Sequence, residues 1–151
     1  MIKLSNLADY AVVIMTTIAT RAPDKLNASD VAGLTGVPQA TASKVMGQLA
    51  RADLLESHRG IGGGFALART AEQISIANII EAVDGPIALT NCIDHAPGNC
   101  SLTSICGMKN HWQIMNSAVR GAFEGVALAD LVAAPALFEI DEPAPLSAQG
   151  R

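Results

Sequence analysis

The sequence has few aromatic residues, no long apolar run, and no cysteine outside one short stretch. Aromatic side chains make up 3% of a chain that is 50% hydrophobic, so the core must be built from aliphatic side chains. No apolar run approaches the roughly 20 residues that a membrane-spanning helix needs, which argues against membrane insertion. The segment Met1 to Ser5 lacks the apolar stretch of a secretory signal. We therefore expect a cytoplasmic protein that forms one well-packed domain, or a compact domain plus an extension.

All three cysteines, Cys92, Cys100 and Cys106, fall within fifteen residues. The residues between them are mostly small, polar or turn-forming, whereas a cysteine that only fills a core belongs to an apolar periodic pattern. Thiols stay reduced in the cytoplasm, so a disulfide framework is disfavoured. Three thiolates on one loop suit a soft metal or an iron–sulfur cluster, with a fourth ligand still to be found.

The charge is distributed unevenly along the chain. Residues 1–70 carry seven basic and five acidic groups, a net +2, and residues 71–151 carry three basic and nine acidic groups, a net −6. The overall net charge of −4 argues against indiscriminate nucleic-acid binding. A mildly basic first half favours a DNA-reading region joined to a region with another task.

Apolar residues at helical spacing predict a mainly α-helical chain. The first helix has a stripe through Leu7, Ala11, Ile14 and Ile18, with Val12 and Val13 on its other side. A short second helix is expected to open at the N-cap pair Ser29–Asp30, with Val31 and Leu34 facing inward. Helices are predicted over 4–20, 29–34, 39–52, 76–83, 108–123 and 126–133.

A glycine-containing turn at 35–38 joins the second helix to the third, which is a helix-turn-helix pattern. The third helix is expected to bury Ala42, Val45, Met46 and Leu49. Two short strands, 54–58 and 65–69, follow at once and are joined by a glycine-rich tip, as in a hairpin. The fold class that results is a winged helix-turn-helix with a two-stranded wing, a cysteine loop and a long helix whose Trp112, Met115, Val119 and Phe123 are spaced for a partner.

Polar residues at the start of the third helix and in the wing are candidates for DNA contact. Residues near the start of such a helix enter the major groove, where Gln39 can address base edges and Lys44 can neutralise a phosphate. Arg59 in the wing suits an adjacent minor groove. The glycine tip lacks the Lys-Ser/Thr of a nucleotide-binding loop and links two strands, so we discount phosphate binding. The candidate DNA-binding residues are Gln39, Ala40, Thr41, Ser43, Lys44, Gln48, His58 and Arg59.

With these motifs in place, residues 1–133 resemble the Rrf-two family of winged-helix regulators, which includes IscR, NsrR and RirA. The resemblance rests on LSNLADYA at 4–11, RGIGGG at 59–64, IANIIEAV at 76–83 and the three-cysteine loop. The phrase EAVDGPIALT at 81–90 is most similar to the subgroup that regulates the SUF iron–sulfur assembly operon. The resemblance implies a homodimer that binds a palindromic double-stranded operator with an affinity set by cluster state.

The fourth cluster ligand has four candidates. The resemblance to NsrR implies Asp9, supplied from the partner subunit, and we place it first, although an acidic residue near a helix N-terminus has its own electrostatic reason to be there. An open iron site comes second, and His111 and His95 follow. IscR-like relatives use a histidine three residues after the last cysteine, but Lys109 occupies that position here.

Three cysteines with an oxygen ligand or an open position favour a 4Fe–4S cluster over 2Fe–2S. Structural zinc sites commonly carry a Cys-x(2–4)-Cys pair. These cysteines are separated by seven and five residues, so the spacing disfavours a zinc site.

The sequence predicts a transcriptional regulator that senses iron–sulfur status, with repression of cluster-assembly genes as the expected mode. The alternative is a winged-helix regulator that senses nitric oxide, oxidants or zinc through the same cysteines. An enzyme is disfavoured because no Cys-x-x-Cys motif is present. The expected organisation is a DNA-binding region over 1–70, a cluster loop with dimerisation helices over 71–134, and a disordered tail over 135–151.

Overall fold

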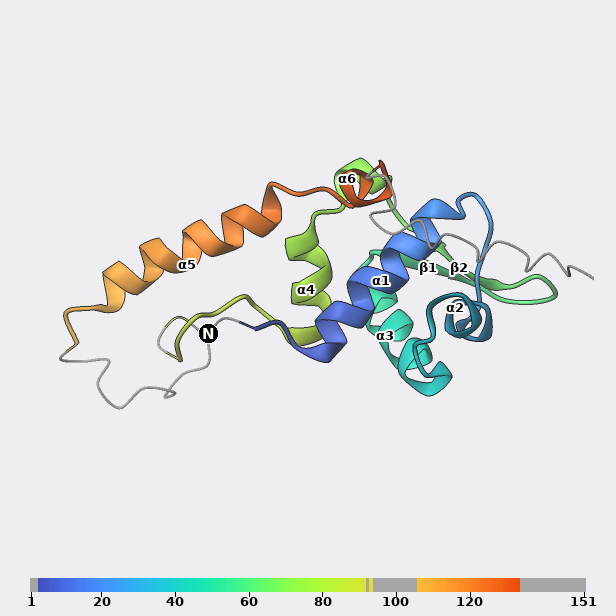
Figure 1. The fold of residues 1–151 in the computed structure, drawn as a ribbon, viewed down its shortest axis with the longest axis horizontal. Helices are drawn as coiled ribbons and strands as arrows, with labels where there is room; N and C mark the ends of the chain where they lie inside the picture. The colour runs from blue at the N-terminus through green and yellow to red at the C-terminus, as the bar shows by residue number, and fades with distance from the viewer. Residues whose placement is uncertain (1–2, 92, 94–105, 134–151) are drawn as a thin grey trace, which may run out of the picture.

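A computed structural model describes residues 3–91, 93 and 106–133 of the chain (Figure 1). They form a mainly helical fold with a two-stranded antiparallel sheet, which confirms the predicted fold class. Among them, no helix is both long and apolar enough to cross a bilayer. The elements are α1 (Asn6–Thr20), α2 (Ala28–Thr35), α3 (Gln39–Arg51), β1 (Leu55–His58), β2 (Gly64–Leu67), a 3₁₀ turn (Ala71–Gln73), α4 (Ile76–Asp84), α5 (Lys109–Glu124) and α6 (Leu128–Ala133).

The helix-turn-helix consists of α2 and α3. The predicted N-cap at Ser29–Asp30 is wrong, because Asn27 caps α2: its Oδ1 accepts the N–H groups of Ser29 at 2.8 Å and Asp30 at 3.0 Å. Asp30 completes a capping box by accepting the Asn27 N–H at 2.9 Å. At the other end Gly36 has a φ of 76°, which ends the helix at little steric cost.

The recognition helix α3 buries the four residues that its periodicity predicts, Ala42, Val45, Met46 and Leu49. On α2, Val31 is buried as expected. The inward placement of Leu34 is wrong, because 47% of this residue is exposed. Val31 is therefore the buried residue of α2, and Ala28 packs against the core from the start of the helix.

The wing pairs β1 with β2 from Leu55↔Leu67 to His58↔Gly64, within a residue or two of the predicted bounds. A third segment joins its edge, since Leu26 and Phe65 exchange two backbone hydrogen bonds of 3.1 and 2.8 Å. The close approach depends on Gly64: a Cβ there would lie 2.8 Å from the Leu26 backbone. The wing is thus fixed to the chain segment that enters α2.

The hydrophobic core is centred on α1, which packs against α2, α3, α4 and α6 (Figure 1). Ile14 and Ile18 of α1 lie in this core with Ile79 of α4 and Leu128 of α6. The core therefore crosses the expected boundary at residue 70 and joins the helix-turn-helix to the segment that leads into the cysteines.

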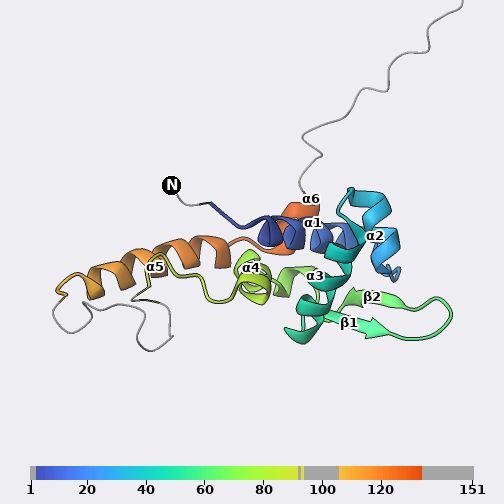
Figure 2. The same cartoon turned by 90° about the horizontal axis from the view of Figure 1, so that it is seen from below.

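The long helix α5 extends away from the winged-helix body and packs on α4 (Figures 1 and 2). Phe123 packs against the core. The stripe that was expected to face a partner is therefore split, because Phe123 packs inward whereas Met115 is 40% exposed. Ile114, next to Met115 but outside the stripe, is 70% exposed. The exposed part of α5 is the part available to a second subunit.

Candidate nucleic-acid interface and cysteine loop

The first two turns of α3 present polar side chains to solvent. Gln39, Ala40, Ser43 and Lys44 are exposed, and Thr41 is half-buried. The buried stripe on the opposite side of the helix holds this face outward. The arrangement suits major-groove reading, in which residues near the start of the helix meet base edges and phosphates.

Gln48 does not share this exposed face. Its Nε2 donates to the Val83 carbonyl of α4 at 3.4 Å, and its Oε1 is buried without a hydrogen-bond partner in the described part of the chain. The side chain of Gln48 is therefore turned toward α4, whereas the other candidate residues of α3 point away from it. Gln48 lies about two and a half turns after the start of α3, where α3 packs against α4.

The wing lies beside α3 (Figure 2). Arg59 is exposed, and His58 is half-buried with its Nε2 3.8 Å from Glu56 Oε2. Gly63 closes the tip by donating its N–H to the Gly60 carbonyl at 2.9 Å. A Cβ on Gly63 would lie 2.5 Å from the His58 carbonyl oxygen, so the turn requires glycine at this position.

The segment that leads into the cysteines is held against α5 by Asn116. Its Oδ1 accepts the Leu89 N–H at 2.9 Å, and its Nδ2 donates to the Ile87 carbonyl at 2.9 Å. Asn116 is 8% exposed and is the one buried polar residue among those the structure describes. Both hydrogen-bonding groups of the carboxamide are thus satisfied by backbone, which fixes 87–89 beside the helix.

A second polar contact joins α4 to α5. The guanidinium of Arg120 contacts Glu81 at two points, Nε to Oε1 at 2.9 Å and Nη2 to Oε2 at 3.2 Å. Arg120 also donates to Glu124 at 2.9 Å, and the Ile87 N–H donates to Glu81 at 3.5 Å. The hydrogen bond to Glu81, followed by the attraction of the Glu81 and Glu124 charges, raises the pKa of Arg120 above its usual value.

Of the predicted thiol ligands, Cys106 lies within the described residues. It is a free, half-buried thiol three residues before α5 begins. Cys92, Cys100 and the alternative ligand His95 lie outside the described residues, as does the tail 135–151. Among the positions that are described, no three His, Cys, Asp or Glu side chains gather into a metal site.

The candidate fourth ligand Asp9 is exposed on the first turn of α1. Ser5 caps this helix by accepting the Ala8 N–H at 3.0 Å, and its Oγ donates to Asp84 Oδ1 at 2.8 Å. The N-terminus of α1 is thereby tied to the end of α4, where the cysteine-bearing segment begins. His111 is exposed on α5.

Sequence reasoning missed Asn116, Glu81 and Arg120. A signal for Asn116 was present, because it occupies the same helical stripe as Trp112, Val119 and Phe123. A polar residue in an apolar stripe requires a partner when it is buried. The Glu81–Arg120 pair joins residues 39 positions apart, so no local sequence pattern predicts it.

The Rrf2 profile, described as an iron-dependent transcriptional regulator, matches residues 4–134. A candidate HTH-type transcriptional regulator of Mycobacterium tuberculosis is 33% identical over 132 residues, covering 85% of this chain and 80% of the relative. The HTH-type transcriptional regulator NsrR of Bacillus licheniformis is 28% identical, covering 86% of this chain and 92% of that protein.

Solved structures show the same fold. The Bacillus subtilis global cysteine regulator CymR superposes with a TM-score of 0.68 at 22% identity, covering 87% of this chain and 97% of that one. The T. potens IscR structure gives a TM-score of 0.67 at 21% identity, covering 87% of this chain and 86% of that one.

Proposed function

This chain belongs to the Rrf2 family of iron-dependent transcriptional regulators, and we propose that it senses iron–sulfur status and represses SUF cluster-assembly genes. As a transcriptional regulator it is not an enzyme. The observation that carries the proposal is a pair of hydrogen bonds from Asn116 of α5 to the backbone of Ile87 and Leu89, in the segment that enters the cysteine loop. These hydrogen bonds connect the three-cysteine loop to the domain that carries the helix-turn-helix.

In the proposal, the start of α3 enters the major groove of an operator. Gln39 and Ser43 address base edges, Lys44 contacts a phosphate, and Arg59 in the wing reaches the adjacent minor groove. Ala40, Thr41 and His58 line the same surface. Support comes from the exposure of Gln39, Ser43, Lys44 and Arg59 and from the position of the wing beside α3.

The proposed regulator is a homodimer on a palindromic operator, and α5 supplies its interface. The exposed surface of α5 combines the apolar Ile114 and Met115 with small residues that permit close helix approach. A two-fold dimer gives two recognition helices related by the symmetry of the operator. The small residues are Ala118, Gly121, Ala122 and Gly125.

The donor set fits an iron–sulfur cluster. Cys106 is a free thiol, and Cys92 lies three residues beyond Leu89, the point held by Asn116. Cys92, Cys100 and Cys106 would hold a 4Fe–4S cluster, with Asp9 of the partner subunit as fourth ligand. The bound cluster supplies a redox-sensitive link between thiolates.

The protein's own contacts give a route from the loop to the DNA-reading helix. Asn116 holds the loop entrance on α5, and Arg120 holds α5 on Glu81 of α4. Gln48 then joins the end of α4 to α3. Ordering the loop would thereby bias the angle of α3 in each subunit, a two-state change of the kind that ligands control.

The test is anaerobic purification from the cytoplasmic fraction, with iron and sulfide counted and the absorbance spectrum recorded. We expect iron and sulfide in equal amounts, loss of both in Cys106→Ser, and an altered spectrum in Asp9→Ala. Protein that contains zinc alone would overturn cluster sensing in favour of a zinc sensor. Metal-free protein whose thiols react with nitric oxide or oxidants would favour direct thiol sensing.

A further inference from the structure

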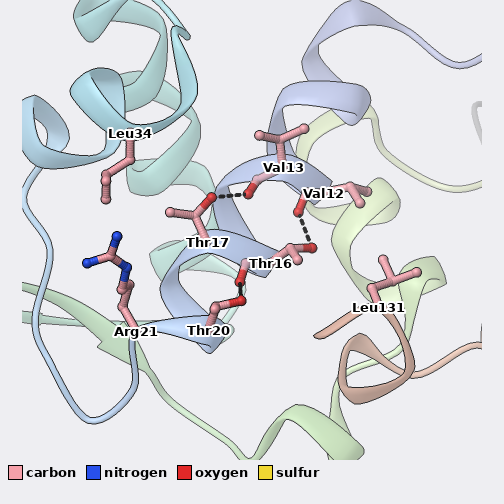
Figure 3. A pocket seen from close by; sticks show the side chains of 8 residues that line it. All are labelled: Val12, Val13, Thr16, Thr17, Thr20, Arg21, Leu34 and Leu131. Carbon is pink, nitrogen blue, oxygen red and sulfur yellow. Dashed lines mark hydrogen bonds between the residues drawn. The ribbon is translucent and has the colours of Figure 1, made fainter. Parts of the chain in front are cut away.

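An apolar groove lies on the side of α1 away from the core, between α2 and α6 (Figure 3). Its volume is about 480 Å³, within the range of ligand sites, which is about 300–1,000 Å³. Leu34 and Arg21 lie on one side and Leu131 on the other, with a row of α1 side chains between them (Figure 3). The exposed Leu34 that contradicts the helical pattern of α2 is thus one wall of this groove.

The floor of the groove offers methyl groups in place of polar donors. Thr16, Thr17 and Thr20 each donate their hydroxyl proton to a carbonyl four residues earlier on α1, at 2.9, 2.8 and 2.8 Å. Val12 and Val13 complete the floor. Because the hydroxyl protons are already used within the helix, an occupant would be apolar where it meets α1.

One cation lies at the rim. Arg21 is exposed at the end of α1, and its guanidinium has no ion-pair partner within the described part of the chain. Lys25 follows four residues later and is also exposed. The groove therefore suits a segment with apolar side chains and neighbouring carboxylates.

We propose that the occupant is this chain's own segment 135–142, with the sequence PALFEIDE. It carries Leu137, Phe138 and Ile140 beside three acidic residues, and it lies beyond residue 134, where the family match ends. Leu131 in the groove wall is six residues before Leu137, so the connection reaches up to about 20 Å.

Two further observations favour this segment over other occupants. The exposed apolar surface of α5, proposed for the subunit contact, lies at the far end of the molecule from α2 (Figure 1), so a second copy bound there does not cover the groove. A tethered segment also has an effective concentration of about millimolar, so modest contacts suffice to seat it.

The proposed contact pairs Leu137, Phe138 and Ile140 with the threonine methyl groups, Leu34 and Leu131. The carboxylates of Glu139 and Asp141 then lie near Arg21. Seating the segment would brace α2 against α1 and α6 and so support the first helix of the helix-turn-helix. The contact requires neither DNA nor a metal.

The test is methyl NMR of the full-length protein, with resonances assigned for Val13, Leu34 and Leu131. We expect Phe138→Ser to shift all three resonances, and the matched tail variant Leu146→Ser to leave them in place. Arg21→Glu should lower the docked-to-free ratio about fivefold, whereas Arg21→Lys should preserve it, since the rim supplies charge only. Unchanged resonances in Phe138→Ser would overturn the proposal.

Photo-crosslinking identifies the occupant directly. With a benzophenone-bearing phenylalanine in place of Phe138, we expect crosslinks to α1, α2 or α6 within a single chain. Crosslinks between two chains would overturn the proposal in favour of a partner's tail, and crosslinks to other elements would overturn the groove as the site. Neither readout depends on operator binding or iron content, so failure here leaves the proposed function standing.

Discussion

Asn116 and Leu89 are joined by a partly buried hydrogen bond of 2.9 Å, from the backbone N–H of Leu89 to the side-chain oxygen of Asn116. The same carboxamide donates to the Ile87 carbonyl. Both its oxygen and its NH₂ group are therefore hydrogen-bonded to backbone groups 27 and 29 residues away in the sequence. Such a contact specifies where the segment entering the cysteine loop must lie.

Asn116→Ala should destabilise the protein by about 2–3 kcal/mol, because the Leu89 N–H and the Ile87 carbonyl would both be left without their partner. Urea denaturation followed by far-UV circular dichroism measures this change. Ser117→Ala, at the exposed neighbouring position, is the control and should change stability by no more than about 0.5 kcal/mol. Equal effects at the two positions would contradict the assigned contact.

Gly63→Ala should distort the wing, because the new Cβ would lie 2.5 Å from the His58 carbonyl oxygen. We expect a loss of about 1–3 kcal/mol in stability and weaker operator binding. Gly33→Ala in α2, where no atom outside the helix lies within 4 Å, should instead stabilise by about 0.5–1 kcal/mol. Thermal denaturation and gel-shift titration separate the two, and normal operator binding by Gly63→Ala would contradict a role for the wing.

Lys44→Ala should weaken binding to all DNA sequences to a similar extent and lower the slope of log affinity against log salt by about one. Fluorescence anisotropy at several salt concentrations measures the slope. Lys44→Arg keeps the charge and should keep the slope. A slope that is unchanged in Lys44→Ala would remove Lys44 from the phosphate contacts.

Gln48→Leu should leave operator affinity unchanged, because the side chain faces α4 through a 3.4 Å hydrogen bond to Val83. The cost in stability should be below about 1 kcal/mol, since the variant also removes a buried oxygen that lacks a partner. Gln39→Leu is the matched comparison and should cost about 1–3 kcal/mol at one operator position. Loss of sequence preference in Gln48→Leu would restore it to the DNA contacts.

The parts of the fold that sequence could predict were those set by local periodicity. Val45, Met46 and Leu49 recur at helical spacing, and the structure buries them as that spacing requires. Leu34 has the same spacing from Val31, yet it is 47% exposed, because it borders the surface groove over α1 and not the core.

The remaining features depend on contacts between distant segments. The polarity of Gln48 predicts a surface residue, and only the packing of α4 against α3 shows its hydrogen bond to the Val83 carbonyl. The cap at Asn27 was missed because Ser29 and Asp30 are equally good capping residues in isolation. In the fold, Asn27 directly follows Leu26, whose backbone pairs with Phe65 of the wing. The cysteine loop was recognisable because three cysteines within fifteen residues form a local sequence pattern.

In the proposed function, the state of the thiol loop sets operator affinity. The direct measurement is the dissociation constant for operator DNA of anaerobically purified protein, before and after its iron is removed by a chelator, with Cys106→Ser measured alongside. We expect the two wild-type values to differ by about tenfold or more, a coupling of about 1.4 kcal/mol, and Cys106→Ser to match the iron-free value. Equal affinities with and without iron would contradict it, because a ligand that binds two states equally shifts neither.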